Sequence, residues 1–104
     1  MAKCEINGGI CGQVTVVEAE NAGSGKVRLK ITSDCANIKK VAEELFEIDA
    51  FADFAKRAIS TKTYEVVSKY SPHPACVVPS GILKVVEVAV GMALPREASI
   101  KIEK

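Results

Sequence analysis

The 104-residue chain lacks both an excess of one charge and a long uninterrupted apolar run. Its fourteen Lys and Arg residues stand against thirteen Asp and Glu residues, which leaves a formal net charge of +1. Because nucleic acids and anionic membranes are bound through clustered cations, we expect neither partner. The most apolar stretch, residues 77–94, is interrupted by charged residues, Pro and Gly. It therefore cannot supply the roughly 20 uninterrupted apolar residues of a membrane span.

We also expect no secretory leader. The start, Met1-Ala2-Lys3-Cys4-Glu5, carries a charge pair, and no apolar run of a leader follows it. We therefore expect a cytoplasmic protein. The length is typical of one compact domain, so residues 1–104 are predicted to form a single domain.

Tryptophan is absent and aromatic residues make up only 5% of the chain, so the β-branched residues Val and Ile are expected to fill much of the core. Lys26–Ile31 alternates charged and apolar residues, which predicts a strand with one buried face. Gln13–Glu20 is a second predicted strand, joined to the first through a hairpin loop at residues 21–25. Lys3–Asn7 is a third, and Ser99–Glu103 alternates well enough to predict a short final strand.

After Asp34 the apolar period becomes helical and continues to Ile48, with Ser33 or Asp34 as the predicted cap. Residues 49–70 stay mostly helical, with a second helix start at Thr61 or Thr63. A last helix is predicted from near Pro79 to Ala93. The fold class is thus α+β, a two-layer sandwich in which helices cover one face of an antiparallel sheet of three or four strands.

Paired Cys-x-x-Cys motifs are absent, yet three of the four cysteines lie where their side chains are expected to be accessible. Cys11 lies in a glycine-rich loop before a strand, Cys35 at a helix start, and Cys76 just before the last helix. The positive end of a helix stabilises a thiolate, the form that binds metal. The single histidine, His73, adds a nitrogen donor three residues before Cys76. Three sulfurs and one imidazole suit zinc or an iron–sulfur cluster.

The fourth cysteine, Cys4, is interpreted differently. It alternates with Ile6 along a predicted strand, and free cysteine often behaves as a small buried hydrophobe. We therefore expect Cys4 to pack in the core and to take no part in metal binding.

The order of these motifs resembles the iron–sulfur cluster assembly scaffold family, the U-type scaffold related to the N-terminal domain of nitrogen-fixation scaffolds. The resemblance implies that a nascent iron–sulfur cluster or zinc is held by Cys11, Cys35, His73 and Cys76. It also implies a sulfur donor or a cluster acceptor as a partner protein. The chain has Cys11-Gly12-Gln13 where the family has Cys-Gly-Asp, and two residues separate its His and Cys where the family has an adjacent pair.

Two other interpretations remain open from the sequence. One is a sulfur-transfer or redox protein in which Cys35 or Cys76 is a thiol of low pKa. The other is a small structural or interaction domain whose cysteines merely fill space. A metal site with protein ligands only has no open position for a substrate, so the leading interpretation is not an enzyme. The apolar last helix leaves room for a homodimer contact.

Overall fold

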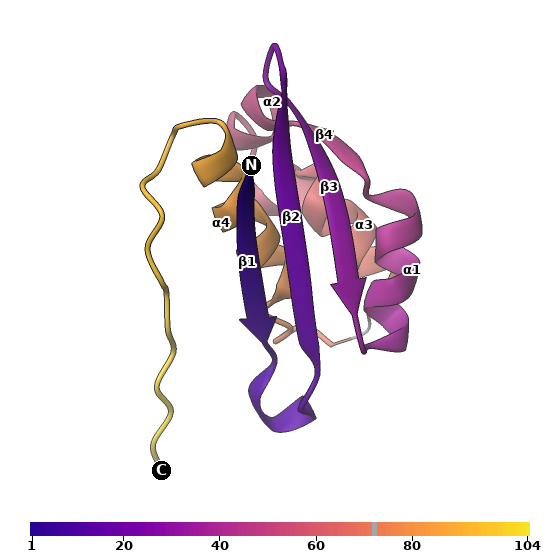
Figure 1. The fold of residues 1–104 in the computed structure, drawn as a ribbon. Helices are drawn as coiled ribbons and strands as arrows, with labels where there is room; N and C mark the ends of the chain where they lie inside the picture. Colours follow the sequence, from indigo (N-terminus) through magenta and orange to yellow (C-terminus); the bar gives the residue numbers. More distant parts are fainter. Residues whose placement is uncertain (72) are drawn as a thin grey trace.

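A four-stranded antiparallel sheet covered by helices on one face makes up the fold (Figure 1). The structure is a computed structural model that describes residues 1–71 and 73–104. The strands lie in the order β1-β2-β3-β4, and each neighbouring pair is antiparallel. The predicted α+β sandwich is therefore confirmed. The elements are β1 (Ala2–Asn7), η1 (Gly9–Cys11), β2 (Val14–Gly23), β3 (Lys26–Ser33), α1 (Ala36–Glu44), β4 (Glu47–Asp49), α2 (Ala50–Phe54), η2 (Ala58–Ser60), α3 (Lys62–Tyr70) and α4 (Val78–Ala89).

The two faces of the sheet differ as the alternation in the sequence predicts. Val17 of β2 and Val27 of β3 are completely buried under the helices. On the outer face, the strand register sets Glu18 opposite Lys3 on one side and opposite Lys30 on the other. Opposite charges on neighbouring strands stabilise a sheet surface that faces water. The outer face is therefore a solvated face, and the helix side forms the core.

The core lies between the sheet and the apolar faces of α1, α3 and α4 (Figure 1). Each of these helices buries residues spaced one turn apart, as expected of amphipathic helices. Helix α4 packs on β1 and β2, and Gly81 permits its close approach. A Cβ atom at Gly81 would lie 2.6 Å from Cγ1 of Ile6 on β1. The buried aliphatic residues of these three helices are Ile38 and Val41 of α1, Val66 and Val67 of α3, and Val78, Ile82, Val85 and Val86 of α4.

The first helical segment is shorter than the sequence pattern predicts. Helix α1 ends at Glu44, and Ile48 lies on β4, where it pairs with Val27. The predicted cap is also wrong, since Cys35 is the N-cap residue and its side chain makes no capping hydrogen bond. The second helix start is confirmed at Thr61, whose hydroxyl accepts a hydrogen bond from the amide of Tyr64.

The predicted final strand is wrong. Ser99–Glu103 is extended but forms no part of the sheet, and the fourth strand is β4. Helix α4 ends at Ala89, four residues before the predicted end, and Gly91 follows with a positive φ of 78°. Residues 94–104 are exposed and run away from the end of α4 as a single extended segment, which we call the C-terminal tail (Figure 1).

Across the two described ranges, every helix is too short or too polar to cross a membrane.

Candidate metal and thiol site

The four predicted ligands belong to three connections at the same end of the sheet (Figure 1). Cys11 ends η1 between β1 and β2, Cys35 joins β3 to α1, and His73 and Cys76 lie between α3 and α4. The strand register gives the reason for the first two. Asn7 pairs with Val14, and Thr15 pairs with Ser33, so β1 ends, β2 begins and β3 ends at one edge of the molecule.

Cys11 is exposed in a tight glycine-rich turn. The amide of Gly8 donates to the carbonyl of Gln13 at 2.9 Å, and that of Gly12 donates to the carbonyl of Gly9 at 2.9 Å. Gly9 and Gly12 have positive φ angles, which glycine adopts without steric cost. A Cβ atom at Gly8 would collide with the sulfur of Cys11, so the missing side chain leaves room for the thiol.

Cys35 is held at the first turn of α1 by a buried hydroxyl pair. Its amide donates to Oγ of Ser33 at 3.1 Å, and that oxygen shares a 2.7 Å hydrogen bond with Oγ1 of Thr15. The carbonyl of Cys35 accepts the amide of Lys39 at 2.9 Å, which starts the helical hydrogen bonds. The thiol is half-buried and forms no disulfide. Because Cys35 is the N-cap residue of the nine-residue helix α1, its thiol lies at the positive end of that helix.

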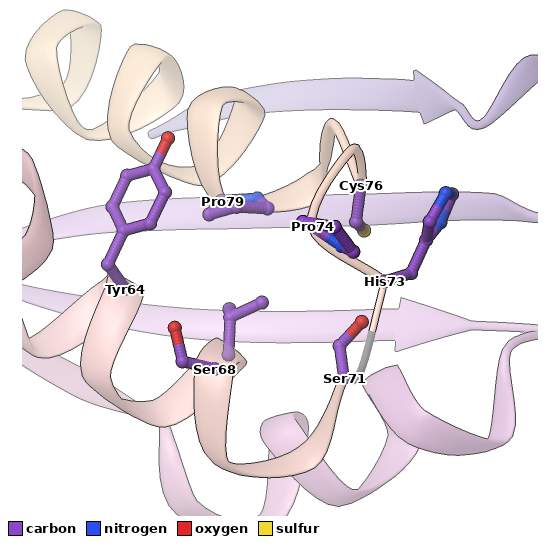
Figure 2. Close-up of a pocket in the computed structure, with 8 residues that line it drawn as sticks. Tyr64, Ser68, Ser71, His73, Pro74, Cys76 and Pro79 are labelled. Atoms are coloured by element: carbon purple, nitrogen blue, oxygen red, sulfur yellow. The ribbon is translucent and has the colours of Figure 1, made fainter.

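His73 and Cys76 form one end of a groove beside α3 and the start of α4 (Figure 2). The amide of Cys76 donates to the carbonyl of His73 at 3.1 Å, which closes the turn between them. His73 is exposed and Cys76 is half-buried. The groove has a volume of about 380 Å³ and is lined by Tyr64, Val67, Ser68, Ser71, His73, Pro74, Cys76 and Pro79.

Hydroxyl groups on α3 line the groove, a feature that was not predicted from the sequence. Tyr64 and Ser68 lie on α3 and Ser71 at its C-cap, spaced four and then three residues apart, so they share one face of the helix. The hydroxyl of Tyr64 also lies 3.2 Å from that of Ser80 on α4. The spacing of these hydroxyl residues is the sequence feature that could have predicted the groove lining, because it marks a helix face that is not packed in the core.

The predicted ligands share an end of the sheet but are not gathered into a metal centre. Within the described ranges, no three His, Cys, Asp or Glu side chains lie close enough together to hold a metal ion. The donor types suit zinc or an iron–sulfur cluster. The structure thus supplies suitable donors without a preassembled site.

Cys4 lies apart from these connections, in the middle of β1. It packs against the hydrophobic core, and its thiol lies 3.6 Å from the carbonyl oxygen of Gly81, to which it donates. Burial raises the pKa of the Cys4 thiol. The predicted core role of Cys4 is confirmed.

Residues 2–102 match the model of a family of unknown function, DUF6951. The chain belongs to this family. The matched range contains all four strands, the three connections that carry the candidate ligands, and most of the C-terminal tail. No curated protein and no solved structure matches the chain.

Proposed function

We propose that this protein binds a metal ion or an iron–sulfur cluster through Cys11, Cys35, Cys76 and His73. The observation that supports this proposal is the placement of three separate connections, with three thiols and an imidazole, at one end of the sheet. All four cysteines are free, as metal-binding thiols must be. Free thiols also fit a reducing compartment such as the cytoplasm.

The ligands would come together only on binding, since no three candidate ligands are gathered in the described residues. Cys11 is the residue expected to move, because it is exposed and its turn contains two glycines with positive φ angles. Cys35 lies against a buried hydrogen-bonded framework and is expected to stay in place. Zinc and iron–sulfur clusters both select thiolate ligands, so binding would release thiol protons.

Metal analysis after anaerobic purification tests this proposal. We expect near-stoichiometric zinc or iron, with visible absorption if a cluster is present. Cys35→Ala and Cys76→Ala are expected to lose most of the metal. Cys4→Ala is the matched control, because it makes the same Cys-to-Ala change at a residue that packs against the core. This variant should keep the metal. Full metal retention in Cys35→Ala and Cys76→Ala, or equal loss in all three variants, would refute the proposed ligand set.

A second candidate function is thiol chemistry at Cys76, and the groove is the observation that favours it. The groove places a half-buried thiol beside hydroxyl groups and His73, in a space large enough for a small substrate or a peptide side chain. In a sulfur transfer, the Cys76 thiolate would attack the outer sulfur of a donor persulfide. The donor's S–S bond would break, and the donor would leave as a thiolate.

Alkylation kinetics separate the two candidates. If Cys76 is a reactive thiol, metal-free protein should be alkylated at Cys76 much faster than at Cys4, and incubation with a small persulfide should add one sulfur atom there. Slow alkylation at Cys76, at the rate of Cys4, would argue against the thiol function. It would leave the metal proposal to be decided by the metal content.

A further inference from the structure

We propose that residues 99–103 of the C-terminal tail add as an antiparallel strand to the free edge of β1 in a second copy of the chain. The exchange would be reciprocal, so that each copy gives one strand and receives one. This inference concerns assembly and is independent of the metal proposal.

The edge of β1 is open to a further strand. β1 is the first strand in the sheet order and pairs only with β2. An edge strand presents unpaired amide and carbonyl groups to an extended chain. Six residues, Ala2–Asn7, form this edge, which is enough for the five residues of the proposed added strand.

The tail has the pattern of a strand but buries none of its apolar side chains. Ile100 is 75% exposed and Ile102 is 87% exposed, and both alternate with polar residues. Two exposed isoleucines on one side of an extended segment are the pattern of a half-buried strand whose partner is missing. Pairing with β1 would give them that partner.

One antiparallel register matches both the apolar side and the charges. When Ile100 lies opposite Ile6, Ile102 lies opposite Cys4, and these four side chains share the core side of the sheet. Directly opposite residues point to the same face. The same register sets Lys101 opposite Glu5 and Glu103 opposite Lys3, on the water side. Shifting it by two residues in either direction brings like charges together, as Lys101 with Lys3 or as Glu103 with Glu5.

The tail is poorly suited to pairing with β1 of its own chain. Figure 1 shows that it leaves the end of α4 and runs in the same direction as β1. Both segments contain Lys-x-Glu in the same order, Lys3 and Glu5 in β1 and Lys101 and Glu103 in the tail. A parallel alignment of the two motifs sets Lys opposite Lys and Glu opposite Glu. A second copy can approach in the antiparallel direction, in which the charges attract.

Sedimentation of the full chain over a range of concentrations tests the proposal. We expect a reversible dimer. Exchanging the tail charges, with Lys101→Glu and Glu103→Lys together, is expected to weaken dimerisation by about tenfold or more, because both attractive pairs become repulsive in each copy. Adding Lys3→Glu and Glu5→Lys should restore the dimer. The double variant Ile100→Ser with Ile102→Ser should also weaken the dimer, because it removes the apolar side chains that pairing would bury.

Hydrogen exchange gives an independent measurement on the unmodified chain. Alternate amides among residues 99–103, those that would donate to β1, are expected to exchange slowly at concentrations where the dimer forms and fast where the chain is monomeric. A chain that stays monomeric at high concentration would overturn the proposal. The proposal would also be overturned if neither tail variant weakens the dimer. The same holds if adding Lys3→Glu and Glu5→Lys fails to restore the dimer of the charge-exchanged tail variant.

Discussion

At the scale of single residues, the absence of a side chain is as important as its presence. Gly81 allows α4 to touch β1, where Ile6 occupies the space that a Cβ atom would need. Gly8 leaves space for the sulfur of Cys11 in the same way. Such positions could not be identified from one sequence, because a glycine in a helical pattern has no feature that reveals which atoms lie beside it. Cys4 was predictable, since its alternation with Ile6 shows the buried side of a strand.

Gly81→Ala is expected to destabilise the protein even though alanine favours helix formation. The new methyl group would meet Ile6. Overpacking a core costs about 1–3 kcal/mol, and over most of this range the cost is larger than the gain in helix propensity of about 1 kcal/mol. Urea unfolding measures the free energy of unfolding. Adding Ile6→Val removes one of the colliding carbons, so the double variant should lose less than the sum of the single changes. An unchanged or increased stability of Gly81→Ala would contradict the contact.

At the scale of elements, the spacing of apolar residues predicted the strands and helices that depend on local sequence. It failed where pairing with a strand distant in sequence determines the structure. β3 was predictable because its alternation is complete. The end of α1 was not, because Leu45 and Ile48 continue the helical spacing and no Gly or Pro interrupts it. Ile48 pairs with Val27 of β3 and therefore lies on β4 and not on the helix. Ser99–Glu103 failed for the opposite reason: its alternation is complete, but no neighbouring strand receives it.

A surface ion pair connects α1 to α3 and makes a testable contribution to stability. Glu44 accepts hydrogen bonds from Lys69 at 2.6 Å and from the hydroxyl of Tyr70 at 2.7 Å. The Lys69 hydrogen bond, followed by that of Tyr70, lowers the pKa of Glu44. A carboxylate with a lowered pKa in the folded state contributes stability at neutral pH, and this contribution disappears as the pH falls through its titration.

Glu44→Gln should therefore be slightly less stable than the wild type at neutral pH and equal to it in acid. Measuring the free energy of unfolding between neutral and acidic pH tests the difference. The effect is expected to be small because the pair is exposed to solvent. Glu43→Gln is the control, since it removes the neighbouring exposed charge without touching Lys69 or Tyr70. If the free energy of unfolding of Glu44→Gln still differs from that of the wild type in acid, the ion pair of Glu44 with Lys69 is not the cause of the difference.

At the scale of the whole molecule, the order of the candidate ligands was predictable and their separation was not. Loops that follow β1 and β3 of an antiparallel sheet must lie at the same end, so the shared location of Cys11 and Cys35 follows from the strand pattern. How close the thiols come depends on loop geometry. The tight turn around Cys11 depends on backbone hydrogen bonds from Gly8 to Gln13 and from Gly12 to Gly9, which no side-chain pattern encodes.

Zinc should stabilise the whole fold if the proposed ligands bind it in the folded state only. A free zinc concentration of 100 times the dissociation constant would add about 2.7 kcal/mol to the free energy of unfolding. Thermal unfolding with and without zinc measures this change. The midpoint of Cys35→Ala should respond much less than that of Cys4→Ala. An equal rise in both variants would mean that zinc binds elsewhere.

The hairpin between β2 and β3 has a practical value that follows from the strand directions. Its turn, Ser24-Gly25, lies at the opposite end of the sheet from all three candidate ligand connections. A fluorescent dye or surface tether on a selectively reactive non-natural amino acid in place of exposed Ala22 would therefore leave the thiol end accessible. Immobilising the protein there would test whether it captures the sulfur donor or cluster acceptor that the proposed function implies.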